Sequence, residues 1–131
     1  MNNLIEKQNN ALVNTLITVA STSEKQSVIP YSKSGKKTEA ILLYEVLINN
    51  PYQFKQYELF EEVYFKIKIK PHLKIETYLL QRSELCSIFG WGIYGDKEGR
   101  LALVPCESEH YTRLFEDFST TKKKAFNKHK G

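Results

Sequence analysis

Cysteine, proline, tryptophan and long apolar runs are all scarce in this sequence of 131 residues, which holds two cysteines, four prolines and one tryptophan. A small secreted domain that depends on disulfides carries more cysteines than this. No run approaches the ~20 apolar residues of a transmembrane helix, and the polar residues 1–11 lack the apolar centre of a signal peptide. The sequence therefore predicts a cytoplasmic protein without a membrane partner, in which Cys86 and Cys106 are reduced core residues.

Charge of one sign is also limited, because the net charge of +4 arises near one end of the chain. Five lysines fall within the last ten residues, and their charge exceeds that of the whole chain (Lys122, Lys123, Lys124, Lys128 and Lys130). This distribution weakens a nucleic-acid interpretation based on overall charge. Hydrophobic residues at 41% and aromatic residues at 12% indicate a folded chain and exclude an intrinsically disordered one.

The order of the local patterns predicts one α+β domain over residues 12–118, with a flexible arm at 1–11 and a basic disordered tail at 119–131. Residues 12–20 are rich in β-branched side chains and predict a strand. Apolar residues alternate with lysines over 63–70, which predicts a half-buried second strand.

Gly99 closes a short polar connection between two apolar runs, so residues 92–104 predict a β-hairpin. The expected sheet is mainly antiparallel, with a core helix and a C-terminal helix packed on it.

The core helix is predicted over residues 38–48, where Thr38 can cap the first turn and apolar side chains nearly encircle the axis. Residues 21–37 form a polar loop, and 51–57 form an aromatic connection. Ser108 caps the C-terminal helix, whose apolar residues recur at helical spacing as far as about Phe118. Residues 74–89 allow a strand followed by a helical turn at 83–87, which we favour, or a single helix.

The segment Gly90–Gly95 spells the glycine pattern of dinucleotide-binding loops. That pattern works where the glycines end a strand and open a helix that holds the pyrophosphate. Here a turn and a second strand are expected to follow, so the glycines are better explained by a close backbone approach beside Trp91. Binding of a ligand at Trp91 is the alternative.

A basic loop precedes the predicted core helix. Lys36, Lys37 and the free amides after Thr38 could attract an anion, although the segment departs from the phosphate-loop pattern at two positions. The alternative is a solvated loop that ends in a threonine cap.

Cys106, Glu107 and His110 are the candidate catalytic residues. A thiol and an imidazole four residues apart could meet on one helical face as a nucleophile and its base. If the helix begins after Ser108, Cys106 lies outside it and that geometry is lost. No metal site is predicted, because zinc needs three or four ligands and no others have suitable spacing. No cofactor is predicted.

Several short segments occur in a characteristic order from residue 14 to residue 111: Asn14–Ala20, Lys36–Thr38, Asn50–Tyr52, Gly90–Ile93, Glu98–Leu103 and Glu107–Tyr111. Together they resemble a family of short bacterial proteins defined only as a domain of unknown function. The resemblance implies a bacterial single-domain protein and supplies no activity. The family's basic pair and tyrosine before Gly-Trp-Gly, and its histidine afterwards, are replaced here by Ser87, Ile88, Phe89 and Tyr94.

No paired carboxylates, catalytic triad or metal cluster can be assembled from these residues. The first hypothesis is therefore a non-enzymatic binding or regulatory module with a protein or small-ligand partner. A second is a small enzyme with a pocket near the 92–104 hairpin. A third is nucleic-acid binding through the basic tail and the lysines of 63–70, beside which aromatic side chains could stack on bases.

Overall fold

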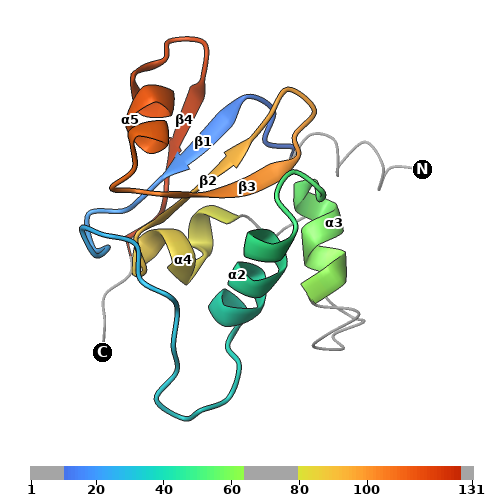
Figure 1. Ribbon diagram of the computed structural model, residues 1–131, viewed down its shortest axis with the longest axis vertical. Coiled ribbons are helices and arrows are strands. Elements are labelled where there is room, and N and C mark those ends of the chain that lie inside the picture. The colour runs from blue at the N-terminus through green and yellow to red at the C-terminus, as the bar shows by residue number, and fades with distance from the viewer. Residues whose placement is uncertain (1–10, 64–79, 128–131) are drawn as a thin grey trace.

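The computed structural model describes residues 11–63 and 80–127 (Figure 1). The elements follow one another as β1 (Thr15–Thr18), α2 (Glu39–Asn49), α3 (Gln56–Phe60), η3 (Leu80–Arg82), α4 (Glu84–Ser87), β2 (Trp91–Gly95), β3 (Leu101–Pro105), α5 (Glu109–Glu116) and β4 (Thr121–Lys124). The α+β prediction is confirmed.

The four strands form one sheet in the order β3-β2-β1-β4. Strand β2 pairs antiparallel with both β3 and β1, whereas β4 lies parallel to β1. The hairpin predicted over 92–104 is confirmed, and Gly99 in its turn has a φ of 80°. The sheet is thus mainly antiparallel, as predicted, and its one parallel pair joins segments from the two ends of the described chain.

Helices cover both faces of the sheet (Figure 1). Ile17 and Ile93 lie on one face, in the main core with residues of α2, α3 and α4. Leu16 and Val104 lie on the other face, in a smaller core with Tyr111 of α5. Successive side chains of a strand point to opposite faces, so each strand contributes residues to both cores.

Helix α2 begins where the sequence predicts. The Thr38 hydroxyl accepts a hydrogen bond from the Ile41 amide at 3.3 Å, and Glu39 occupies the first turn. Leu43 and Leu47 are fully buried, whereas Ile48 is 44% exposed. The helix is therefore the predicted core helix, but it is not buried all round.

Helix α3 differs from the sequence prediction, which places an aromatic connection over residues 51–57. Leu59, Phe60 and Val63 are buried at helical spacing, and residues 61–63 continue the helix as a π turn. The prediction of a strand from Val63 was therefore wrong at its first residue. Residues 64–70, the rest of that strand and its lysines, lie outside the described residues.

The segment before the hairpin is helical where it is described. Ser83 caps α4 by accepting a hydrogen bond from the Leu85 amide, so the predicted helical turn at 83–87 is confirmed. Leu80 and Gln81 belong to a 3-10 turn and not to the expected strand. Residues 74–79 lie outside the described part.

The prediction of a disordered tail from residue 119 was wrong for Thr121–Lys124, which form β4. The Thr121 amide donates to the Asn14 carbonyl at 2.8 Å, and the Ala125 amide donates to the Thr18 carbonyl at 2.9 Å. All four residues of β4 are exposed. Lysine side chains on an edge strand stay in water, so a run of three lysines does not prevent this segment from pairing with β1. The predicted arm at 1–11, apart from Ala11, and residues 128–131 lie outside the described residues.

Removal of residues 119–131 should destabilise the fold, because β1 would lose the partner of its outer edge. We expect the free energy of unfolding, measured by urea titration, to fall by about 3 kcal/mol, since several backbone hydrogen bonds contribute ~1 kcal/mol each. The control Lys123→Ala removes a charge and leaves the strand, so its effect should stay within about 0.5 kcal/mol. Equal stability of the truncated and full chains would contradict the role of β4.

Candidate functional site

Gly90, just before β2, and the glycines of β2 face the protein's own chain. A Cβ at Gly90 would lie 2.5 Å from the Gln26 carbonyl oxygen, and one at Gly92 would lie 2.7 Å from the Tyr111 ring. A Cβ at Gly95 would overlap the Leu12 carbonyl oxygen. The chain after Gly95 enters the hairpin turn and not a helix. The glycines thus allow tight packing, and the helix that would hold a pyrophosphate does not follow them.

Trp91, a candidate ligand-binding residue, is 8% exposed. Its indole nitrogen donates to the Val28 carbonyl at 2.9 Å, and its ring packs against Tyr44 of α2 with centroids 5.4 Å apart. Both parts of the side chain are therefore used within the protein: the indole nitrogen holds the loop of residues 21–37, and the ring packs on α2.

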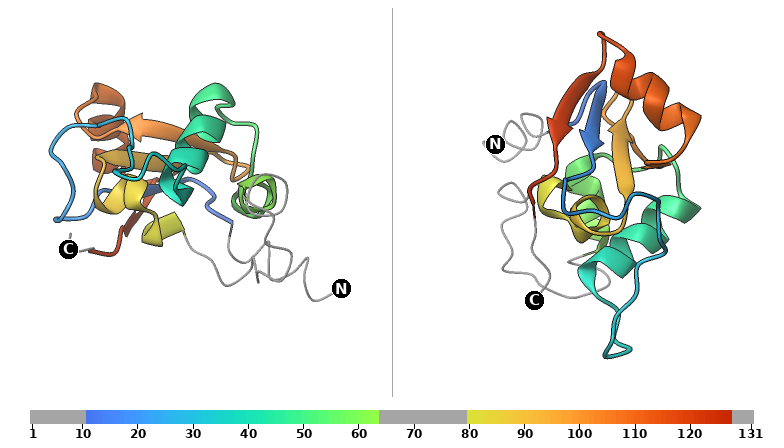
Figure 2. Two further views of the ribbon diagram at one scale, coloured as in Figure 1. Left: turned by 90° about the horizontal axis from the view of Figure 1, so that it is seen from below. Right: turned by 90° about the vertical axis from the view of Figure 1, so that its left-hand side faces the viewer.

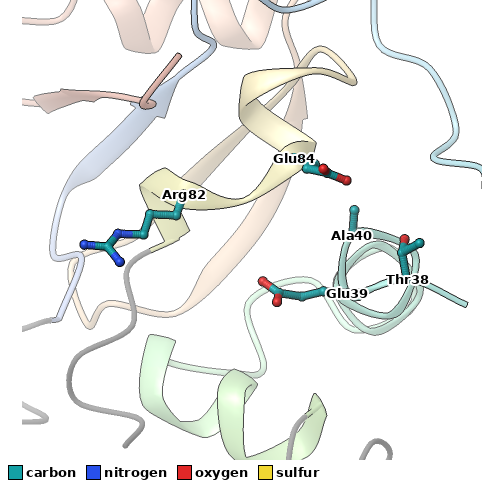
Figure 3. A pocket seen from close by; sticks show the side chains of 5 residues that line it. All are labelled: Thr38, Glu39, Ala40, Arg82 and Glu84. Carbon is teal, nitrogen blue, oxygen red and sulfur yellow. The ribbon is translucent and has the colours of Figure 1, made fainter. Parts of the chain in front are cut away.

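The candidate anion site at the start of α2 does not have the expected charge. Lys37 forms an ion pair with Glu45 at 2.9 Å. The cavity beside Thr38 has a volume of about 330 Å³, and its lining includes the carboxylates Glu39 and Glu84 (Figure 3). Arg82 also lines it, although its guanidinium points away from Glu84 (Figure 3). Two carboxylates at a helix N-terminus disfavour an anion there.

The candidate catalytic residues contact different partners. Glu107 accepts two hydrogen bonds, from the amide and the hydroxyl of Ser27, both at 2.8 Å. The thiol of Cys106 donates to the Lys25 carbonyl at 3.4 Å. The His110 ring packs on Tyr94, with centroids 6.3 Å apart. Within residues 11–63 and 80–127, no hydrogen bond joins Cys106 to His110.

The electrostatics of this segment favour an unreactive thiol. Burial raises the pKa of Cys106, and the neighbouring Glu107 charge raises it further. Burial alone would raise the pKa of Glu107 as well, but the hydrogen bonds from Ser27 leave that pKa below its ordinary value. Cys106 is therefore protonated at neutral pH, while Glu107 is an ionised anchor for the loop. Cys86 is also a free thiol and is completely buried.

Helix α5 carries apolar side chains that the protein itself leaves uncovered. Tyr111 is buried, and its hydroxyl accepts a hydrogen bond from the Val19 amide at 3.0 Å. Phe115 is 52% exposed, and Phe118, just after the helix, is 103% exposed. The helical spacing groups Phe115 and Phe118 with Tyr111, but of these three residues only Tyr111 is buried.

A depression of about 240 Å³ adjoins Phe115, and the lining includes Cys106, Tyr111 and Glu116. We refer to this depression together with Phe115 and Phe118 as the α5 surface. The exposed phenylalanines could not be found from sequence, because the helical period shows which residues share a face and not how much of that face the sheet covers.

Neither a metal centre nor a membrane span is found in the part of the chain that the structure describes. No three histidine, cysteine, aspartate or glutamate side chains gather there in a way that could hold a metal ion. No helix in these ranges is long and apolar enough to cross a membrane.

A family model described as "Family of unknown function (DUF6157)" matches residues 7–131. The chain belongs to this family. The match confirms the resemblance to an uncharacterised family, and the DUF6157 description names no activity. No curated protein and no solved structure matches the chain.

Several of the short segments singled out in the sequence have structural roles in this chain. Asn14 and Tyr52 adopt positive φ values of 45° and 60°, and their amides donate to the hairpin carbonyls of Asp96 and Leu101. Ser108 caps α5 by accepting a hydrogen bond from the Tyr111 amide. These contacts fix two loops to the hairpin and set the start of α5, which are structural roles.

The raised pKa of Cys106 predicts slow reaction with a disulfide reagent such as dithionitrobenzoate at pH 7, because the thiolate is the reactive form. The rate should rise as the pH increases beyond about 8.5, the ordinary cysteine pKa. Cys106→Ser should abolish the reaction, since Cys86 is buried. A fast reaction at pH 7 with an apparent pKa below that value would instead indicate an activated nucleophile.

Proposed function

We propose that this chain is a non-enzymatic binding module that recognises a protein partner through the α5 surface. The observation that supports this most directly is the exposure of Phe118, together with that of Phe115 one turn earlier. The turn between α5 and β4 stands at one extremity of the molecule (Figure 1). Two phenylalanines at such a position offer a partner a large apolar area, on the order of 150–250 Å² for each ring.

A protein partner explains this surface better than a small ligand does. Small molecules bind in concave sites that cover most of their surface. Phe118 is fully exposed and follows the C-terminal end of the helix, so it can insert into a pocket of the partner. Aromatic residues, phenylalanine among them, are enriched at protein interfaces, where a few side chains supply most of the binding energy.

The charges around the phenylalanines suit the border of such an interface. Arg113 and Glu109 form an exposed ion pair at 3.2 Å, and Glu116 is also exposed on α5. Protein interfaces combine an apolar centre with a polar rim that remains in contact with water. Charges of both signs at the rim would set the orientation of the partner.

The contacts of the candidate catalytic residues support a binding function over an enzymatic one. A catalytic cysteine needs a lowered pKa or an adjacent base. Cys106 has a raised pKa, and Glu107 anchors Ser27. The cytoplasmic location expected from the sequence is part of this proposal.

The double substitution Phe115→Ser and Phe118→Ser tests the proposal. Cross-linking followed by affinity purification from the source cells should yield a partner that binds the unmodified chain and is lost from the double variant. The purified partner should then bind at least about tenfold more weakly to the double variant by calorimetry, since each large interface aromatic contributes ~1–2 kcal/mol or more.

Phe126→Ser is the matched control, because Phe126 is 45% exposed and lies beyond the opposite end of β4. This variant should retain full binding. A partner that binds the double variant and the unmodified chain equally well would contradict the assignment of the α5 surface, as would turnover of a substrate that depends on Cys106.

A further inference from the structure

We propose that the outer edge of β4 accepts an extended acidic peptide as a fifth strand of the sheet. Strand β4 lies at the end of the order β3-β2-β1-β4, beside β1 (Figure 2, right). The interaction uses an edge of the sheet and not the α5 surface, so it does not depend on the function proposed above.

The pairing with β1 determines which backbone groups of β4 point outward. The Ala125 amide donates to the carbonyl of Thr18 in β1, and the Thr121 amide donates to the carbonyl of Asn14, just before that strand. In a parallel pair, alternate residues direct both backbone polar groups to the same side. Lys122 and Lys124 therefore direct their amides and carbonyls away from β1. Outward backbone groups of this kind are the ones that an added strand pairs with, and of these four the Lys124 carbonyl already accepts from Gln81.

Gln81 already occupies one end of this edge in the manner of a paired residue. Its carbonyl accepts a hydrogen bond from the Phe126 amide at 2.9 Å, and its side-chain amide donates to the Lys124 carbonyl at 3.0 Å. Among residues 11–63 and 80–127, the Lys122 amide and carbonyl and the Lys124 amide have no such partner. An incoming strand would continue the pattern of pairing that Gln81 begins.

The side chains of β4 specify an acidic partner. Lys122 directs its ammonium to the carbonyls of Asp117 and Thr120. Lys123 and Lys124 are exposed and form no ion pair with any residue in the two described ranges. Lys124 shares a sheet face with α5, while Lys123 lies on the opposite face. A strand with carboxylates opposite these lysines gains favourable cross-strand pairs on both faces.

The same charges disfavour other occupants of the edge. A second copy of the chain that paired through β4 would place lysines opposite lysines, which destabilises a strand pair. A nucleic acid would neutralise the ammonium groups but could not continue a β-ladder. A peptide that supplies both carboxylates and a backbone satisfies the charges and the outward polar groups together.

The direct test uses a short fluorescein-labelled peptide with two consecutive glutamates between valines, because consecutive residues of a strand place one carboxylate on each face. Fluorescence anisotropy should show binding by the full chain that weakens with added salt. Amide hydrogen exchange should slow at Lys122 and Lys124 when the peptide is present. A peptide with lysine in place of glutamate, and one with a central proline, should not bind.

Two substitutions at one position separate charge from backbone pairing. Lys124→Ala removes one cross-strand charge pair and should weaken binding about threefold. Lys124→Pro also removes the outward amide and should weaken binding at least about tenfold. The amides that bind β1 belong to other residues, so the proline variant should keep its circular dichroism spectrum.

Charge reversal tests the proposal even if the proline variant does not fold. The double variant Lys123→Glu and Lys124→Glu should no longer bind the glutamate peptide and should bind the lysine peptide instead. Phe115→Ser with Phe118→Ser should leave peptide binding unchanged, which distinguishes this edge from the α5 surface.

Three results would overturn the inference. The first is a lack of detectable peptide binding at millimolar concentration, and the second is a folded Lys124→Pro variant that binds as tightly as Lys124→Ala. The third is a single-stranded oligonucleotide that binds more tightly than the peptide and competes with it, which would assign the lysines to nucleic acid instead.

Discussion

The close approach of backbone and side chains to β2 is the constraint on which the rest of the structure depends. This strand lies between β1 and β3. Gly90, just before it, leaves room for Gln26, and Gly95 at its end leaves room for Leu12. Between them, Gly92 lies under the Tyr111 ring, so α5 can approach the sheet. A side chain at any of these positions would collide with a loop, a helix or the neighbouring strand.

This packing removes the open cradle that a nucleotide phosphate would need at the glycine-rich segment. A phosphate cradle needs free amides and an open approach at the start of a helix. In this chain the space above Gly90 holds the loop of residues 21–37, which is fixed further by Trp91 and Glu107. The glycine-rich segment therefore contributes to the fold. Functional contacts are to be sought on the surfaces that the fold leaves uncovered, the α5 surface and the edge of β4.

Local signals in the sequence predicted the elements that depend on local contacts. The cap at Thr38, the turn before Gly99 and the cap at Ser108 each depend on hydrogen bonds within a few residues. Their positions could therefore be predicted from the chain. The glycines of β2 were also interpreted correctly, because a turn and not a helix was expected to follow them.

Two features that the sequence did not predict, β4 and the exposed phenylalanines of the α5 surface, depend on contacts between distant parts of the chain. Strand β4 pairs with β1 across about a hundred residues, and no local pattern in a run of lysines indicates that partner. In the same way, Phe115 and Phe118 are exposed because the sheet covers only the part of α5 around Tyr111. Long-range contacts also determine the surroundings of Cys106 and Glu107, which bind the loop of residues 21–37. Local sequence patterns could not indicate those partners.

The most direct test of this account compares the stability of two glycine substitutions. Gly95→Ala places a methyl group against the Leu12 carbonyl, whereas Gly35 has a positive φ of 76° and nothing within 4 Å of the position that a Cβ would take. We predict that Gly95→Ala lowers the free energy of unfolding by at least about 3 kcal/mol, and that Gly35→Ala lowers it by about 1 kcal/mol through backbone strain alone. If Gly95→Ala lowers the free energy of unfolding no more than Gly35→Ala does, the central role of close packing at β2 is contradicted.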